Sequence, residues 1–150
     1  MIHLLGIRPW GVYTFYDMGL AVSLALFFLG LSVGSFLNVV AARYDPDRSL
    51  FAWRHLRGRS RCPHCARELR WFELIPLVSF LLQRGSCRSC GERITPLYFF
   101  VELLTGLVFA LLPQVFSGAE LAIWIPAASL LILILAVDAR HMLIPDEANV

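Results

Sequence analysis

Three long charge-free apolar runs constrain this chain more than any other feature. They are Met18–Ala42, Leu103–Ala119 and Leu121–Val137, of 25, 17 and 17 residues. A bilayer core about 30 Å thick requires roughly 17–25 apolar residues of helix. With a mean hydropathy of +0.68, the chain is more apolar than a typical soluble domain. The sequence therefore predicts an α-helical polytopic membrane protein with three transmembrane helices. A secretory signal peptide is a weaker explanation of the first run, which is too long and is followed, not preceded, by most of the basic residues.

The segment between the first and second runs is strongly basic. All 13 basic residues of the chain are arginines, and eleven of them lie in Arg43–Arg93 with only five acidic residues. The positive-inside rule predicts that this loop is cytoplasmic and that the N-terminus faces outward. The second and third helices then form a hairpin, with Trp10 and Trp124 toward the outer interface. Nucleic-acid binding is the alternative, but membrane topology already explains the charge, so we expect no nucleic-acid partner.

The same loop contains every cysteine of the chain, as two C-x2-C pairs separated by 21 residues. The four residues are Cys62, Cys65, Cys87 and Cys90. Two such pairs form the tetrahedral four-cysteine shell of a structural zinc ion. A dithiol redox site would need only one pair, and disulfides are disfavoured on the reducing side of a membrane. We expect short strands and turns around the metal, with His64 as a bystander and the arginines next to the cysteines offsetting the thiolate charge. The apolar stretch WFELIPLVSFLL is expected against the membrane surface or over the cysteine turns.

Polar and small residues inside the helices suggest how the helices pack. Gly30 and Gly34 have the G-x3-G spacing that lets a second helix approach closely. Ser35 and Asn38 lie on one face of the same helix. The favoured interpretation of Asn38 is an interhelical hydrogen bond. Glu102 is interpreted as structural too, in contact with an arginine or the interface.

Asp138 follows the third apolar run and allows two interpretations: the point where a helix leaves the lipid, or a functional carboxylate. Asp146 is a poor partner, since eight helical residues span about 12 Å. Pro145 favours the start of a new helix there. Asp146 would then stabilise the N-terminal end of that helix.

Four segments, in order along the chain, carry a resemblance to a known family. They are GSFLNVVAARYD, the cysteine pairs flanking ELIPLVSF, PLYFFVELLTG and AVDARHMLIPD. Together they resemble the N-terminal half of type IV prepilin peptidases. The resemblance implies a multi-pass aspartic endopeptidase of the bacterial inner membrane that cleaves the leader of type IV prepilins or type II secretion pseudopilins at the cytoplasmic face. Many members also methylate the new N-terminus with S-adenosylmethionine.

Carried over to this sequence, the resemblance makes Asp138 the first of two catalytic aspartates and the four cysteines the zinc ligands. The second aspartate belongs to a G-x-G-D motif, and no such motif occurs in residues 1–150. The expectation is therefore a fragment, inactive unless a missing C-terminal half supplies that aspartate. No residue can be assigned to the methyl donor.

Three domains are expected. Residues 1–42 form the periplasmic N-terminus and first helix, residues 43–95 the zinc-binding loop, and residues 96–150 a hairpin and the start of the peptidase domain. One alternative function is a non-catalytic, membrane-anchored zinc module that binds a partner protein. Another is a thiol oxidoreductase, for which the cysteines would be solvent-reactive.

Overall fold

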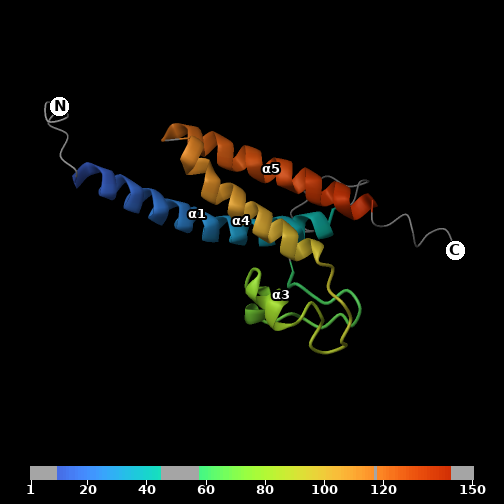
Figure 1. Cartoon of the computed structure of the whole chain (residues 1–150). Helices are drawn as coiled ribbons and strands as arrows, with labels where there is room; N and C mark the ends of the chain where they lie inside the picture. Colours follow the sequence, from blue (N-terminus) through green and yellow to red (C-terminus); the bar gives the residue numbers. More distant parts are fainter. Residues whose placement is uncertain (1–9, 45–57, 117, 143–150) are drawn as a thin grey trace, which may run out of the picture.

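Three long helices form the body of the molecule, and a small cysteine-containing loop projects from one end of them (Figure 1). The computed structural model describes residues 10–44, 58–116 and 118–142. The long helices are α1 (Trp10–Ala42), α4 (Leu97–Val115) and α5 (Ala119–Met142). The loop carries a short 3-10 helix, η1 (Trp71–Leu74), and a single helical turn, α3 (Val78–Leu82). Because no strand occurs within these residues, the α-helical prediction is confirmed.

Each of the three helices is long and apolar enough to cross a membrane, over Gly19–Ala42, Leu97–Val115 and Ala119–Arg140. The number of spans was predicted correctly, but the second begins before the charge-free run and includes Glu102. α4 begins directly after Pro96, whose φ of −64° suits a helix start. The faces of the helices that point away from the bundle expose large apolar side chains. They include Phe28, Leu111 and Ile123.

The closest contact is between α1 and α4, and it depends on two glycines. A Cβ atom on Gly30 would lie 2.7 Å from the Thr105 carbonyl oxygen, and one on Gly34 would lie 2.9 Å from the Glu102 Cα. No side chain fits at either position, so the predicted close approach is confirmed. Helix α5 packs against both, and one apolar cluster draws residues from all three helices. Its buried members are Leu37, Ala41, Val101, Ile132 and Ala136.

Hydrogen bonds between side chains and the neighbouring helix join α1 to α4 at both ends of their contact. The Asn38 Nδ2 donates to the Tyr98 carbonyl oxygen at 2.9 Å, which confirms the predicted interhelical bond. At the other end the Gln114 amide donates to the Ser23 hydroxyl at 3.1 Å. Serine and glutamine are common in such positions, and nothing in the sequence singles out this second pair.

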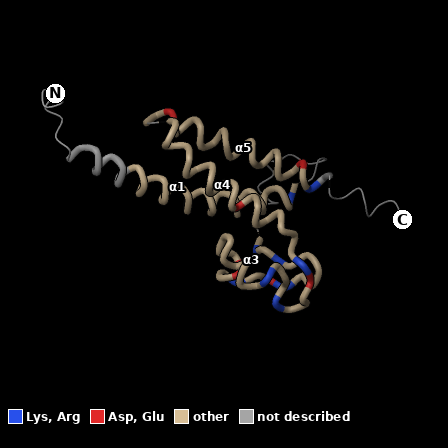
Figure 2. The backbone as a smooth tube through the Cα atoms, in the orientation of Figure 1, with Lys and Arg blue, Asp and Glu red and all other residues tan. Residues whose placement is uncertain are grey.

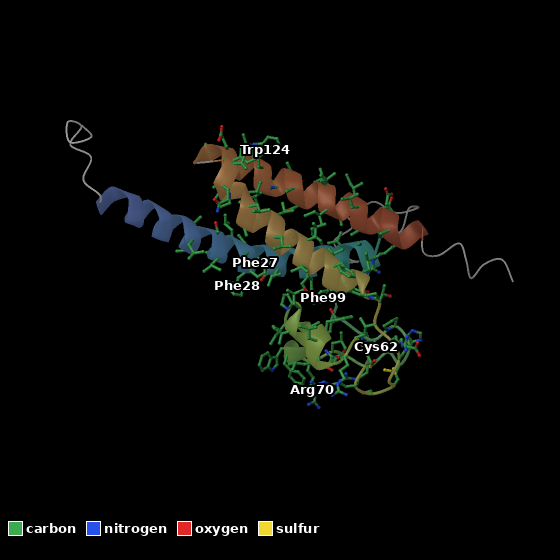
Figure 3. All side chains as sticks on the ribbon, viewed as in Figure 1. Phe27, Phe28, Cys62, Arg70, Phe99 and Trp124 are labelled. Carbon is green, nitrogen blue, oxygen red and sulfur yellow. The ribbon has the colours of Figure 1, made fainter. Side chains whose placement is uncertain are left out.

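The loop, residues 58–95, is named here the cysteine module. The expected short strands are absent from its described residues, which form only isolated bridges, Arg61 with Glu68 and Ser86 with Arg93. Each cysteine turn reverses the chain within a few residues, so no ladder longer than one pair can form. The apolar stretch between the turns folds instead into η1 and α3. The Phe80 ring of α3 packs on the Phe99 ring of α4, with 5.5 Å between the ring centroids, so α3 lies against the helices (Figure 3).

Candidate metal centre and the aspartate of α5

Both cysteine pairs have the same backbone conformation. The N–H of the first cysteine donates to the carbonyl five residues later, Cys62 to Arg67 at 3.0 Å and Cys87 to Glu92 at 2.8 Å. Its own carbonyl accepts the N–H four residues later at 2.9 Å in both pairs. Each turn therefore directs two sulfur atoms toward a common point.

The four sulfur atoms meet between the two turns. All lie within 4.8 Å of one another, and the Sγ atoms of Cys62 and Cys90 are 3.8 Å apart. A tetrahedral ion with Zn–S bonds of about 2.3 Å would separate its sulfurs by about 3.8 Å. Cys62 and Cys87 are buried, whereas Cys65 and Cys90 are exposed. The sulfur positions thus fit a zinc ion, and the sequence prediction that the cysteines gather is confirmed.

Backbone N–H groups, burial and the neighbouring sulfurs perturb the protonation of Cys87 and Cys90. Backbone N–H groups of Cys90 and Ser89 lower the pKa of the Cys87 thiol to about 6. The Glu92 N–H lowers the pKa of Cys90 too, but burial and the neighbouring thiols outweigh it and raise that pKa to about 12. Four thiolates cannot share this small volume without a cation. The donor set is therefore suited to a divalent metal.

One arginine lies near the sulfurs. The charge of Arg67 acts favourably on the Cys87 sulfur, and its Nη2 pairs with the Glu73 carboxylate at 2.7 Å. The Glu73 side chain is 1% exposed. The Arg67 guanidinium, with the backbone N–H of Arg70, holds the pKa of the Glu73 carboxyl below its usual range. This ion pair, in which Glu73 is buried, was not predicted, since both residues look like ordinary loop charges in the sequence.

The other charged side chains next to the cysteines interact with groups other than the sulfur atoms. Arg61 pairs with Glu68 at 2.9 Å, and the guanidinium of Arg88 lies 5.3 Å from the centre of the Phe72 ring. His64 lies outside the sulfur cluster, with its Nε2 3.9 Å from the Glu92 carboxylate. Of the arginines next to the cysteines in the sequence, only Arg67 is seen to act on a sulfur atom, so the expectation that several of them offset the sulfur charge is met there alone.

Glu102 links the cysteine module to the helices. It is 9% exposed, and its carboxylate accepts the Leu77 N–H at 2.8 Å. Leu77 precedes α3 and has a φ of +58°, an unusual conformation for a branched side chain. The structural role expected of Glu102 is confirmed, but its partner is a backbone amide of the module and neither an arginine nor the interface.

A cavity of about 620 Å³ lies where the module meets the helices. Its wall includes Asn38 of α1, Tyr98 and Glu102 of α4, Arg140 of α5 and Phe80 of α3. Charged residues gather at this end of the molecule and in the module, whereas the rest of the helices is nearly free of them (Figure 2). We call this end of each helix its loop end.

Asp138 lies near the loop end of α5 and is exposed. Among the described residues it makes no ion pair or side-chain hydrogen bond. Asp146 lies outside the described residues. The part of the chain that the structure describes therefore brings the four cysteines together but places no second carboxylate in contact with Asp138. No pattern in the sequence singles out Arg140, whose guanidinium lies 4.6 Å from the centre of the Tyr98 ring.

Comparison with known proteins places the chain in a family. A family model described as the bacterial peptidase A24 N-terminal domain matches residues 28–116. A prepilin leader peptidase/N-methyltransferase of Myxococcus xanthus is 45% identical over 126 residues, which cover 83% of this chain and 36% of the relative. The protein of the same name in Bacillus subtilis is 41% identical over 123 residues, which cover 81% of this chain and 48% of the relative. That of Klebsiella pneumoniae is 37% identical over 123 residues, which cover 81% of this chain and 54% of the relative.

The match covers most of this chain but only part of its relatives. The chain spans between a third and about half of the length of these three proteins. No solved structure matches it. The matched residues extend from α1 through the cysteine module to the end of α4, so they include all four cysteines and the α1–α4 contact. The chain belongs to the bacterial peptidase A24 family, whose N-terminal domain it contains.

Proposed function

We propose that this chain is part of a membrane aspartic endopeptidase that removes the leader of type IV prepilins or type II pseudopilins. The observation that carries the proposal is the position of Asp138. It lies exposed near the loop end of α5, at the same end of the helices as the cysteine module. A carboxylate that must accept water and a peptide requires such a position. The names of the relatives supply the substrate class.

The reaction would use two carboxyl groups, one protonated and one ionised. When two carboxyl groups lie close together, they cannot both ionise easily, so one remains protonated while the other acts as a base. The base activates water for attack on the scissile carbonyl, and the protonated group donates to the carbonyl oxygen. Asp138 would be one of the two groups. The second carboxylate would come from outside residues 1–150, and without it Asp138 would be inactive.

Zinc would have a structural role. Four cysteine ligands leave no open coordination position for substrate or water, so the ion would supply only cross-linking of the two turns. The ligands would be Cys62, Cys65, Cys87 and Cys90. The module is too small to fold on a large apolar core of its own. Holding the turns together would keep Leu77 and Phe80 in position against α4.

The location and the second activity follow the family resemblance. We propose that the protein lies in the bacterial inner membrane, with the N-terminus outside. The zinc-binding loop, residues 43–95, which includes the cysteine module, would lie in the cytoplasm between residues 1–42 and residues 96–150. Arginine enrichment of the loop supports this orientation. N-methylation of the new N-terminus with S-adenosylmethionine is proposed as well, with no residue assigned to it.

The proposal is tested by leader cleavage. The chain, tagged at its N-terminus, is isolated in mild detergent from its native membrane together with any protein that co-purifies. It is then incubated with a pilin precursor, and the product is measured by mass spectrometry. We expect removal of the leader, its loss in Asp138→Asn, and its retention in Glu120→Gln, which removes a carboxylate from the opposite end of α5.

The outcomes separate the competing functions. An unchanged cleavage rate in Asp138→Asn would refute the catalytic role of this residue. A preparation that never cleaves, yet binds zinc and a partner protein, would favour the non-catalytic module instead. The intact mass of the purified chain, compared with 16.9 kDa, shows whether the second carboxylate is on the same polypeptide or on a co-purifying one.

A further inference from the structure

The cavity between the cysteine module and the loop ends of the helices contains polar groups with no partner. It is bounded by α1, α4 and α5 on one side and by the module on the other. Phe99 of α4 lies at this junction (Figure 3). A buried polar group without a hydrogen bond is unfavourable, so such groups mark a place where a ligand or water binds.

The first unpartnered group is an acceptor. Asn38 is 2% exposed, and its Nδ2 donates to the Tyr98 carbonyl oxygen. That bond fixes the orientation of the amide, with Oδ1 as the remaining polar atom. Oδ1 is buried and has no hydrogen-bond partner. Asn38 lines the cavity, so the cavity offers an acceptor that requires an N–H or O–H donor.

The second group is a pair of donors. The Nε and Nη2 atoms of Arg140 are buried and have no hydrogen-bond partner. The guanidinium lies over the Tyr98 ring, 4.6 Å from its centre, so stacking holds its plane in place. Two adjacent donors of a fixed guanidinium match a carbonyl or carboxylate oxygen. Asn38 and Arg140 thus both contact Tyr98 and both line the same cavity.

From this pairing we infer that the cavity binds an extended peptide through its main chain. In an extended chain, the N–H and the C=O of one residue point to the same side. The N–H would donate to Asn38 Oδ1, and a carbonyl oxygen would accept from Arg140. The rings of Phe80 and Phe99, 5.5 Å apart, provide an apolar wall for a side chain. A simple anion would match the arginines of the cavity wall, but it would leave Asn38 Oδ1 without a donor, whereas a peptide main chain satisfies both groups.

The cavity holds a segment that flanks the scissile bond, not the bond itself. Asp138 does not line the cavity. It precedes Arg140 by two residues on α5, and two helical residues are separated by about 200° around the helix axis. The two side chains therefore leave α5 on nearly opposite sides. The inference rests on the proposed function for the identity of the peptide, and it adds where a neighbouring part of that peptide is held.

Photo-crosslinking tests the inference directly. A benzoylphenylalanine replaces Phe99, which lines the cavity, or Phe100, the next residue of the same helix, which is 61% exposed and outside the cavity. Membranes containing either variant are illuminated with a labelled synthetic peptide that spans the leader and first mature residues of a pilin precursor. We expect the peptide to be captured at position 99 but not at position 100, with capture suppressed by excess unlabelled peptide.

Three results would overturn the inference: equal capture at the two positions, capture at neither, or capture of lipid alone at position 99. Leader cleavage is measured in the same membranes with the unsubstituted chain. Cleavage without capture at position 99 leaves the peptidase proposal intact and refutes the cavity. Capture without cleavage, in native membranes that also supply the second carboxylate, supports the cavity and refutes the peptidase proposal.

A second measurement does not require a bulky substituent. In Arg140→Gln the KM for the precursor should rise about tenfold with little change in kcat, because a contact made equally in the ground and transition states is lost. Arg140→Lys keeps the charge but loses the planar fork of N–H donors, so its KM should lie between those of the unsubstituted chain and of Arg140→Gln. Arg84→Gln, an exposed arginine outside the cavity, is the control. An unchanged KM in Arg140→Gln, or a fall in kcat alone, would contradict the inference.

Discussion

Replacing Gly30 with alanine should weaken the packing of α1 against α4. The new Cβ would lie 2.7 Å from the Thr105 carbonyl oxygen and 2.9 Å from the Phe109 Cβ. Ordinary contact begins near 3.4 Å, so the helices would have to move apart by about 0.7 Å at this point. The nearest atom belongs to the backbone and cannot rotate away.

The size of the effect follows from that displacement. A gap of 0.5–1 Å forfeits roughly a quarter to a half of the dispersion energy of the atoms concerned. Overpacking in a tight contact costs about 1–3 kcal/mol. Gly19 lies on the same helix, and a Cβ added there would meet no atom within 4 Å, so this position is open to substitution. Both variants gain the same helix propensity, about 1 kcal/mol. Their difference therefore isolates packing, about 2 kcal/mol.

The assay is thermal unfolding of each purified variant in one detergent, followed by far-UV circular dichroism. For a chain of this length, 1 kcal/mol corresponds to about 2–4 °C in Tm. Gly30→Ala should thus unfold about 4–8 °C below Gly19→Ala. Equal midpoints would refute the reasoning, because they would mean that α1 and α4 are not in the close contact described here.

Three further predictions concern the cysteine module. The purified chain should contain one zinc ion, and Cys62→Ser or chelation should release the ion and expose the loop to trypsin; a metal-free chain with a protected loop would contradict this. Glu102→Ala should speed hydrogen exchange at the Leu77 amide by about tenfold, since that amide loses its carboxylate acceptor; unchanged protection would show that the bond does not hold the loop. The lowered pKa of Glu73 contributes stability that is complete above its unfolded value of about 4.5 and is lost as the pH falls further. Glu73→Gln should therefore reduce the fall in the Tm of the module on acidification, whereas the same change at Glu92, which is exposed, should not.

The number of membrane helices and the gathering of the cysteines could be read from the sequence because each depends on local pattern. A bilayer imposes a length on any spanning helix, and two C-x2-C turns have few other uses. The G-x3-G spacing was equally informative, since only small residues permit such close helix contact. Asn38 was predicted to bond between helices because a lone amide in an apolar run needs a partner.

The boundaries of α4 and the form of the module were not predictable in the same way. A charge in a sequence usually marks the end of a membrane run, but Glu102 lies inside α4 because Leu77, 25 residues away, supplies a buried donor. The expected strands are absent from the described residues of the module, which form only isolated bridges. The cysteine turns reverse the chain within a few residues, so too few residues remain extended to form a longer ladder.

The sequence alone therefore determined the set of elements, which are three apolar helices and two turns with two cysteines each. Each element is specified by interactions with lipid or between near neighbours in the chain. The tertiary structure decided how they are joined. It buried Glu73 with Arg67 and stacked Arg140 on Tyr98. It also left Asn38 Oδ1 without a partner inside a cavity. Such pairings depend on contacts between residues far apart in the chain, and no local pattern encodes which distant side chain a charge or an amide will meet.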